Sequence, residues 1–367
     1  MKNRKKIVFL IADISCVGGI ERVNSLLANG FIDIGYEVEI ISLYKTNDNI
    51  NYFLNENVTV SYINEDSYTG RPGSVLRLFK HLLSFKKLNQ KLNKTVKNYT
   101  IVNSFPMAVL AFPTCLFSKS RFIVIEHVHA LYYNKPLRIF RNFIYKFYNA
   151  IVTLTEQDKL FYDNKHPHVY KIENPLSFET KIKANIDSKN IIAVGRLEKQ
   201  KGFDLLINAY SQIDKKTRSG WTLNIYGQGG EKDHLQYLIK KYSLDNEIFL
   251  HGVVSNISEI YNKHSIFTFS SRFEGFGMVL VEAMNSGLPC ISFDCPTGPK
   301  DILLNGEVGV LVENGNIDKF ALALKSLMIN DKLRYDYSKK SIIRSNDFKL
   351  DTIINKWEKL FMNLDLL

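Results

Sequence analysis

Short runs of consecutive apolar residues alternate along this chain with longer stretches in which apolar positions recur every three or four residues. The runs are rich in valine, isoleucine and phenylalanine, as in buried strands, and the longer stretches have the period of amphipathic helices. In the first half we expect strands at residues 6–12, 36–43, 58–63, 100–103, 121–126 and 150–154. Helical stretches such as residues 20–34 and 74–96 separate these strands, so the pattern predicts a parallel sheet covered on both faces.

The alternation begins again after a polar segment that starts at Asn174-Pro175 and ends near Asp187, where Pro175 disfavours helix. In the second half we expect strands at residues 190–194, 221–226, 247–250, 265–270 and 289–293, and helices at 203–212, 231–242 and 278–285. The sequence therefore predicts an α/β protein of two doubly wound domains, residues 1–175 and 187–349, with a cleft between them. One more amphipathic helix, residues 351–364, follows the second domain.

The composition is that of an ordinary globular protein. Of 367 residues, 45% are hydrophobic and 23% are charged, which excludes a disordered or coiled-coil chain. The four cysteines, Cys16, Cys115, Cys290 and Cys295, are too scattered for a disulfide framework, and the first residues lack the apolar core of a secretory signal. We therefore expect reduced thiols in a cytoplasmic protein. The longest uncharged stretch, residues 98–118, contains two prolines and is not expected to span a membrane.

Positive charge is concentrated in the first half. The net charge is +11, and residues 67–125 contain ten basic residues and no acidic one. Residues 74–96 combine this charge with helical periodicity, and residues 136–150 repeat the combination with Arg138, Arg141 and Lys146. Such helices either lie on an anionic membrane surface or pack on a core with a solvated basic face, and both readings stay open. On the first reading the membrane-facing residues are Arg77, Lys80, Lys86, Lys87, Lys91 and Lys94. No zinc-ligand spacing or helix-turn-helix accompanies the charge, so nucleic acid is not an expected partner.

Four junctions between a predicted strand and the next helix carry glycines, and ligands of doubly wound sheets bind at such junctions. The first contains Gly18-Gly19, without the GxGxxG spacing of a dinucleotide site, and such a pair alone is more often a simple turn. The second contains Arg196 and Lys201, two cations that suit a diphosphate but are also common as solvated surface residues. The third begins at Gly227 and allows close approach of a flat group or a phosphate.

The fourth junction, residues 271–284, is the most specific. Glu274 lies in a glycine-punctuated loop, and Glu282 lies eight residues later in the following helix. Amides at the start of that helix favour a phosphate, whereas the two carboxylates, otherwise ordinary helix-start residues, would accept hydrogen bonds from sugar hydroxyls. Because carboxylates repel a diphosphate, the cations Arg196 and Lys201 would have to offset their charge.

Together these motifs resemble those of the retaining nucleotide-sugar glycosyltransferases of family 4. The resemblance covers essentially the whole chain and is strongest over residues 190–315, where GRLEKQKG, EGFGMVLVEAM, SFDCPTGPKDI and GVLVENG occur in the family's order. It implies the GT-B fold, in which two Rossmann-like domains face a central cleft and a C-terminal crossover helix, here about residues 350–367, packs back on the first domain. The first domain would bind the acceptor and the second the nucleotide sugar.

The resemblance also implies roles for individual residues. Arg196 and Lys201 would hold the donor diphosphate. Glu274 would bind hydroxyls of the transferred sugar, and Glu282 would bind the ribose. The donor-contacting set that the resemblance implies is Gly18, Gly19, Arg196, Lys201, Gly227, His251, Val253, Glu274, Gly275, Phe276, Gly277, Met278, Val279 and Glu282. Catalytic roles fall to Arg196, Lys201, Glu274 and one histidine of the first domain.

That histidine is His127, which the resemblance places beside the anomeric centre. Alternatively, His127 is a loop histidine whose hydrogen bonds are made within the protein and which has no catalytic role. His129 is another candidate for the position beside the anomeric centre. No residue stands out as a covalent nucleophile, so the expected mechanism is front-face attack by an acceptor hydroxyl that the leaving phosphate deprotonates. The chain contains no Asp-x-Asp, the usual ligand of a metal-dependent transferase, so no metal or other cofactor is expected.

Residues 294–301 resemble a variant common in bacterial surface-polysaccharide transferases. This implies transfer of a hexose or N-acetylhexosamine from a nucleotide sugar, with UDP favoured over GDP, to a saccharide acceptor. The acceptor would be lipid-linked at the inner face of the cell membrane, in the synthesis of O-antigen or capsule. A catalytically inactive binding protein and a nucleotide-sugar epimerase of the same fold are the alternatives. Release of UDP together with incorporation of the sugar distinguishes a transferase from both.

Overall fold

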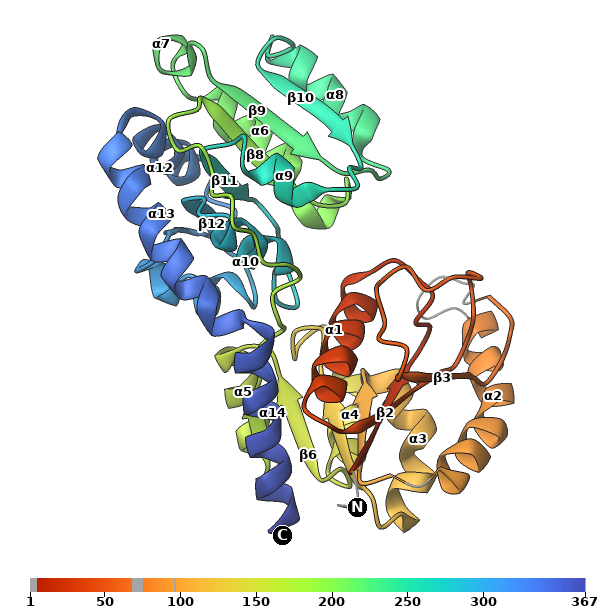
Figure 1. Cartoon of the computed structure of the whole chain (residues 1–367). Coiled ribbons are helices and arrows are strands. Elements are labelled where there is room, and N and C mark those ends of the chain that lie inside the picture. Colours follow the sequence, from red (N-terminus) through yellow and green to blue (C-terminus); the bar gives the residue numbers. More distant parts are fainter. Residues whose placement is uncertain (1–4, 68–74, 96, 367) are drawn as a thin grey trace. The chain divides into compact units, whose positions relative to one another are not determined.

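Figure 1 shows the computed structural model of the chain, which describes residues 5–67, 75–95 and 97–366. The chain divides into two compact units. Unit 1 consists of Met1–Ser177 and Leu350–Leu367, and unit 2 of Phe178–Lys349. Each unit contains one sheet of parallel strands, so the expected fold class of two doubly wound α/β domains is confirmed.

The sheet of unit 1 has seven strands in the order β3-β2-β1-β4-β5-β6-β7. The strands are β1 Lys6–Ile11, β2 Glu37–Ser42, β3 Thr59–Tyr62, β4 Tyr99–Asn103, β5 Arg121–Ile125, β6 Ala150–Thr153 and β7 Val169–Lys171. The helices are α1 Gly19–Asp33, α2 Val75–Lys94, α3 Phe105–Phe117, α4 Lys135–Tyr145, α5 Glu156–Asp163 and α14 Leu350–Asp365.

Successive side chains of β1 pack on opposite faces of the sheet, which explains why its apolar run is unbroken. The ring of Phe9 lies 6.2 Å from that of Phe31 in α1. Val8 and Leu10 belong instead to a buried cluster with Leu88 of α2 and with residues of α3 and α4. Helices α2, α3 and α4 therefore cover one face of this sheet, and α1 covers the other.

The C-terminal helix α14 packs on α1, although it follows unit 2 in the sequence. The ring of Phe361 lies 5.6 Å from that of Phe31 and stacks on Tyr99 at 4.1 Å. Trp357, which is 1% exposed, contacts the same Phe31 at 6.4 Å. Because its aromatic face is buried on unit 1, this helix is an integral part of that unit.

The sheet of unit 2 has six strands in the order β10-β9-β8-β11-β12-β13. The strands are β8 Asn190–Val194, β9 Thr222–Tyr226, β10 Ile248–Gly252, β11 Ile266–Phe269, β12 Cys290–Asp294 and β13 Val310–Glu313. The α-helices are α6 Phe203–Ser211, α7 Lys215–Arg218, α8 Lys232–Lys241, α9 Ile257–Tyr261, α10 Met278–Asn285, α11 Pro299–Ile302, α12 Ile317–Ile329 and α13 Asp331–Ser345. Short 3₁₀ turns are Lys199–Lys201, Leu304–Gly306 and Asn346–Phe348.

The structure differs from the sequence-based expectation in the region of α4. Residues 136–150 do not form one helix, because α4 ends at Tyr145 and Ala150 begins β6. Arg141 does not lie on a solvated basic face either, because its side chain is 0% exposed. The four cysteines are free. Within the described residues, no helix has the length and apolar character needed to cross a membrane.

Candidate active site

In each sheet the strand order reverses at one point, and ligands of doubly wound sheets bind beyond the strand ends there. In unit 2 the reversal lies between the neighbouring strands β8 and β11. The loop after β8 carries Arg196 and Lys201, and the loop after β11 carries Glu274. The structure thus brings the second and fourth predicted junctions to one edge of the sheet of unit 2.

Hydrogen bonds join these two loops. The hydroxyl of Ser270 donates to the carbonyl of Lys201 at 2.9 Å. The backbone N–H of Arg272 donates to the carbonyl of Gln200 at 2.8 Å, and its guanidinium makes two bonds of 2.6 and 2.7 Å to the carboxylate of Asp204 in α6. A bidentate contact of this kind fixes geometry as well as charge. The position of each loop therefore depends on the other.

Lys201 and Glu274 form the centre of this cluster. Nζ of Lys201 lies 2.6 Å from Oε1 of Glu274, and the two side chains are only 15% and 8% exposed. The hydroxyl of Ser271 donates to the same oxygen at 2.6 Å. Among the described residues Oε2 of Glu274 makes no hydrogen bond, which leaves it able to accept one from a ligand. The side chain of Arg196 is exposed, and its guanidinium makes no hydrogen bond or ion pair in the described part of the chain.

The loop that follows β12 holds the backbone of Glu274. The N–H of Glu274 donates to the carbonyl of Pro296 at 3.2 Å, and its carbonyl accepts from the hydroxyl of Thr297. Gly298 has a φ of +102°, and a Cβ there would lie 1.8 Å from the carbonyl oxygen of Phe276. Only glycine fits this position. The motif SFDCPTGPKDI therefore shapes the loop that carries Glu274, a role that the sequence does not indicate.

Helix α10 begins directly after the Glu274 loop. Gly277 precedes it with a φ of +106°, and the amides of Met278 and Val279 belong to the first turn, where the helix dipole favours a negative group. The neighbouring Gly275 and Phe276 complete the predicted stretch of amides. Glu282 lies in the second turn of α10 and is 1% exposed, so its contact with a ribose stays a prediction.

The third predicted junction packs against the second. Gly227 has a φ of +147°, and a Cβ there would lie 1.8 Å from the carbonyl oxygen of Gly195. The N–H of Leu197 donates to the carbonyl of Gln228 at 2.9 Å. The glycines of the loop after β9 thus allow it to lie directly on the cation-bearing loop.

His251, one of the expected donor-contacting residues, lies near the end of β10. Its ring stacks on Tyr226 with centroids 4.5 Å apart and planes inclined by 12°, and Nε2 lies 2.7 Å from Oδ1 of Asn224. Burial lowers the pKa of His251, so the ring is neutral near pH 7. Val253, two residues further, is 67% exposed. A flat aromatic pair beside an exposed apolar side chain is suited to stacking with a nucleobase.

In unit 1 the strand order reverses between β1 and β4. Gly18 and Gly19 follow β1 and lead into α1, and a Cβ on Gly19 would meet nothing within 4 Å. Oε2 of Glu21, in the first turn of α1, lies 2.3 Å from the place that a Cβ on Gly18 would occupy. Burial raises the pKa of Glu21. An acidic group at this helix start suits a hydroxyl-bearing ligand better than a phosphate.

His127 follows β5 and belongs to a network of side-chain amides at the same edge of unit 1. Its Nε2 lies 2.7 Å from Oδ1 of Asn103, which also accepts from Nδ2 of Asn24 at 2.9 Å. Nδ2 of Asn103 donates to the carbonyl of Leu10, which fixes the orientation of the amide. Because Oδ1 can only accept, Nε2 carries the proton and Nδ1 keeps its lone pair. Burial lowers the pKa of His127 to about 4, so this ring is neutral near pH 7.

The rival histidine, His129, lies in the same loop. Its ring meets that of Tyr132 edge-on at 5.9 Å. Burial, together with the nearby charge of Arg141, lowers the pKa of His129. Both histidines are therefore neutral near pH 7, and His127 is the one that contacts Asn103 at the end of β4.

Burial raises the pKa of all four thiols, to about 11 for Cys16 and about 12 for Cys115, so none is an activated nucleophile. In the part of the chain that the structure describes, no three His, Cys, Asp or Glu side chains are grouped as metal ligands.

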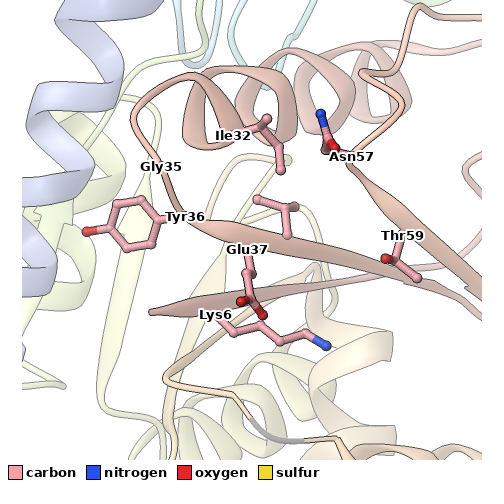
Figure 2. Close-up of a pocket in the computed structure, with 8 residues that line it drawn as sticks. Lys6, Ile32, Gly35, Tyr36, Glu37, Asn57 and Thr59 are labelled. Carbon is pink, nitrogen blue, oxygen red and sulfur yellow. The ribbon is translucent and has the colours of Figure 1, made fainter. Parts of the chain in front are cut away.

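A pocket of about 420 Å³ lies elsewhere in unit 1, and Figure 2 shows its lining residues. Lys6, Glu37 and Thr59 line it, and they begin β1, β2 and β3. The pocket is therefore at the amino-terminal edge of the sheet, away from the ends that carry the loops of Gly18 and His127. None of the predicted site residues lines it, and we assign no role to it.

The predicted membrane-facing cations of α2 differ in their surroundings. Three of them are exposed and make no ion pair with the described residues: Lys86, Lys87 and Lys94. Lys91 instead lies 2.7 Å from one oxygen of Glu39 in β2, and Lys6 lies 2.8 Å from the other. Lys91 is thus part of a salt bridge to the sheet. Lys80 is half-buried, and the side chain of Arg77 lies outside the described part of the structure.

Comparison with known proteins places this geometry in context. Residues 177–344 match the family described as Glycosyl transferases group 1. The chain is 30% identical over 367 residues to the amylovoran biosynthesis glycosyltransferase AmsD of Erwinia amylovora, covering 97% of this chain and 99% of that protein. It is 27% identical over 361 residues to a Campylobacter jejuni alpha-1,4-N-acetyl-D-galactosaminyltransferase, covering 97% of this chain and 98% of that protein.

The structure also resembles that of HepE from Anabaena in complex with UDP and glucose. The TM-score is 0.78 at 16% sequence identity, and the match covers 98% of this chain and all of that one. At this identity the likeness supports the fold, with its two Rossmann-like sheets.

Proposed function

The chain belongs to the glycosyl transferases of group 1, and we propose that it transfers a hexose or N-acetylhexosamine from a UDP-sugar to a lipid-linked saccharide, with retention of anomeric configuration. AmsD is named for amylovoran biosynthesis, and the Campylobacter jejuni relative is named for a glycan on PP-undecaprenol. These names support an acceptor used in building a bacterial surface polysaccharide such as O-antigen or capsule. The complex of HepE with UDP and glucose supports a UDP-linked donor.

The observation that carries this proposal is the pairing of Lys201 with Glu274 at the strand-order reversal of unit 2. A cation and a carboxylate held side by side match two adjacent parts of a nucleotide sugar, the diphosphate and the sugar hydroxyls. The exposed Arg196 adds a second cation, so the three side chains together carry a charge of +1 before a donor binds. This surplus offsets the repulsion between Glu274 and the phosphates.

We propose that the transfer step takes place on one face of the sugar. The bond between the anomeric carbon and the leaving phosphate oxygen breaks, and the acceptor oxygen forms its bond to the same face of that carbon. The proton of the acceptor hydroxyl passes to the leaving diphosphate, which departs as UDP. Arg196 and Lys201 stabilise the negative charge that develops on the diphosphate, and no covalent nucleophile is needed.

The same cations make a divalent metal unnecessary in this scheme. Arg196, Lys201 and the amides at the start of α10 supply the positive field that a metal ion supplies in other transferases. The sequence has no Asp-x-Asp to hold such an ion beside the diphosphate. In unit 1, the free lone pair on Nδ1 of His127 would accept a hydrogen bond from a hydroxyl of the transferred sugar.

We also propose that unit 1 binds the anionic inner face of the cell membrane, where a lipid-linked acceptor would be found. Residues 67–155 contain fourteen basic residues and one acidic residue, Glu126, which is 3% exposed. Large apolar side chains at the end of α3, on α4 and just after it are 43% to 88% exposed: Phe117, Ile139, Phe140, Phe143 and Phe147. Exposed rings on a surface of net positive charge suit an anionic lipid surface. A second copy of the same surface would be repelled.

A product assay tests the transfer reaction. The protein is incubated with radiolabelled UDP-sugars and a fraction of undecaprenol-linked oligosaccharides, and both UDP and labelled glycolipid are measured. We expect one UDP released for each sugar incorporated, and an α-linkage from an α-linked donor by NMR. A β-linked product would overturn retention. An epimerised UDP-sugar without incorporation would indicate an epimerase, and donor binding without any release of UDP would indicate a binding protein.

A further inference from the structure

A fully buried charge lies next to the loop that carries His127. This loop, residues 126–134, connects β5 to α4 and is called the His127 loop below. Arg141 of α4 is 0% exposed, and its guanidinium carbon lies 5.0 to 6.0 Å from the centroids of four rings. The rings belong to Tyr133, Tyr145, Phe161 and Tyr162. Buried ionic groups of this kind are often replaceable by apolar side chains without loss of stability, so core packing alone does not account for Arg141.

The polar contacts of Arg141 all lead to the His127 loop. Nη2 donates to the carbonyl of Ala130 at 2.8 Å, and Nη1 lies 3.6 Å from Oε2 of Glu126. Oε1 of Glu126 accepts a hydrogen bond from the hydroxyl of Tyr145. In the described part of the chain, Nε and Nη1 of Arg141 and Oε2 of Glu126 have no hydrogen-bond partner. The ion pair is therefore held close by its surroundings without being hydrogen-bonded, which is costly in a buried site.

These contacts fix the backbone on both sides of His127. On one side, the N–H of Glu126 donates to the carbonyl of Val152 in β6 at 3.0 Å. On the other side, Ala130 is bound at both of its backbone groups, because its N–H donates to Oδ1 of Asp158 at 2.8 Å and its carbonyl accepts from Arg141. Only three residues separate these anchors. The ring of His127 is held in addition by Asn103.

We propose that Arg141, through Glu126 and Ala130, is a positioning residue for His127, and that the ionised state of Glu126 is required for this positioning. The inference rests on the proposed role of His127 in transfer. Arg141 touches neither donor nor acceptor in this account. Loosening its contacts displaces His127 relative to the sugar, which lowers the rate of the chemical step and leaves donor affinity nearly unchanged.

If Glu126 must be ionised to position His127, kcat should depend on the protonation of Glu126. Burial raises the pKa of Glu126 to about 7, against the opposing effects of Arg141 and the Tyr145 hydroxyl, and the charge of Asp158 raises it further. The other titratable groups that face this cluster are Tyr133, Tyr162 and His129, whose pKa the charge of Arg141 helps to lower. Below pH 7 Glu126 takes up a proton, and its attraction to Arg141 is lost. We expect kcat to fall there, well above the pKa of about 4 that burial gives His127.

The test compares single variants with the same variants in a His127→Ala background, using UDP release from the full chain across pH 5 to 9. We expect Arg141→Met to lower kcat by about 10- to 100-fold while the donor KM changes less than about threefold. Tyr145→Phe removes one hydrogen bond that favours the ionised carboxyl of Glu126. The decrease in kcat at acidic pH, called the acid limb, should therefore begin at a higher pH. Glu126→Gln removes that limb. Lys159→Met, on the neighbouring helix α5, is the matched control and leaves kcat unchanged.

In the His127→Ala background none of these substitutions lowers kcat further, because the residue that they position is absent. An equal loss in that background would overturn the inference, as would an acid limb that persists at the same pH in Glu126→Gln. If Arg141→Met does not fold, Tyr145→Phe decides, since it removes only a hydroxyl. Failure of the parent protein to release UDP would contradict the proposed function itself. An active parent whose variants behave independently of His127 would contradict this inference alone.

Discussion

Nζ of Lys201 lies 2.6 Å from Oε1 of Glu274, so the side chain proposed to bind the donor diphosphate is paired, in the free protein, with the one proposed to bind the transferred sugar. The pair forms between loops that follow two neighbouring strands, β8 and β11. Ser271 holds the same carboxylate oxygen. The site is therefore organised before a donor arrives, which reduces the ordering cost of binding.

The first prediction separates the two members of this pair. Glu274→Gln removes a negative charge next to the diphosphate site, so we expect UDP to bind at least as tightly as to the parent protein. Transfer should fall by at least about 100-fold, because the sugar hydroxyls lose a charged acceptor. Calorimetry with UDP and the UDP-release assay measure the two effects. Glu198→Gln, an exposed residue of the loop after β8, is the control and should change neither. Weaker UDP binding by Glu274→Gln would contradict the assignment.

The second prediction concerns the loop that follows β12. Gly298 and Gly315 both have positive φ, +102° and +75°, but a Cβ on Gly298 would strike the carbonyl of Phe276, whereas a Cβ on Gly315 would meet nothing within 4 Å. Gly315→Ala should therefore cost about 1 kcal/mol of stability and preserve transfer. Gly298→Ala should cost more and abolish transfer, because the Glu274 loop must move. Thermal unfolding and UDP release measure both, and equal effects of the two substitutions would contradict the role of this loop.

The third prediction concerns the protonation state of His127. Asn103→Asp places a carboxylate 2.7 Å from Nε2, and a nearby negative charge favours the imidazolium. We expect the pKa of His127 to rise from about 4 toward or above its ordinary value, and transfer at pH 6 to fall as Nδ1 gains a proton. NMR of protein labelled with ¹⁵N-histidine follows the titration directly. An unchanged pKa would show that Asn103 does not control this ring.

The fourth prediction concerns the membrane surface of unit 1. Changing Lys86, Lys87 and Lys94 to Gln should weaken binding to phosphatidylglycerol vesicles by about 1 kcal/mol per charge, and Phe117→Ser with Phe143→Ser should weaken it further. Lys91 is left intact because it pairs with Glu39. The matched control removes three exposed cations of unit 2: Lys216, Lys232 and Lys240. Cosedimentation is the measurement. Equal losses in the control, or no loss in either set, would contradict the assignment of this surface.

The sequence predicts the sheets well and single side chains less well, for physical reasons. Buried parallel strands are uninterrupted apolar runs, so eleven of the thirteen strands and the loops that follow them are predicted from the local sequence. The two edge strands β7 and β13 are not predicted, because their side chains are mostly half-buried and form no such run. Arg141, by contrast, reads as one of several basic residues on an amphipathic helix, yet it is fully buried, because its partners Glu126 and Ala130 come from the preceding loop. Lys91 reads as a surface cation, yet it pairs with Glu39 of β2. Such partners are determined by tertiary packing, so the local pattern of apolar and charged residues does not predict them.

The candidate site is likewise predicted only in part from the sequence. The spacing of Arg196, Lys201 and Glu274 along the chain suggests phosphate and sugar binding, and the strand order then brings their loops to one edge. Thr297 and Gly298 hold the loop that carries Glu274 in place. The local sequence does not indicate this role, because it shows only a Thr-Gly-Pro turn. Its function depends on a contact with a loop more than twenty residues away.

The measurement that tests the central claim most directly is a calorimetric titration of UDP into the parent protein and into Arg196→Ala/Lys201→Ala. The account predicts that the double variant binds UDP at least about 100-fold more weakly, because two charge-assisted contacts to the diphosphate are lost. Lys199→Ala, an exposed lysine in the same loop, should bind UDP as the parent does. Equal affinity of the double variant and the parent would contradict the claim that these two cations hold the donor.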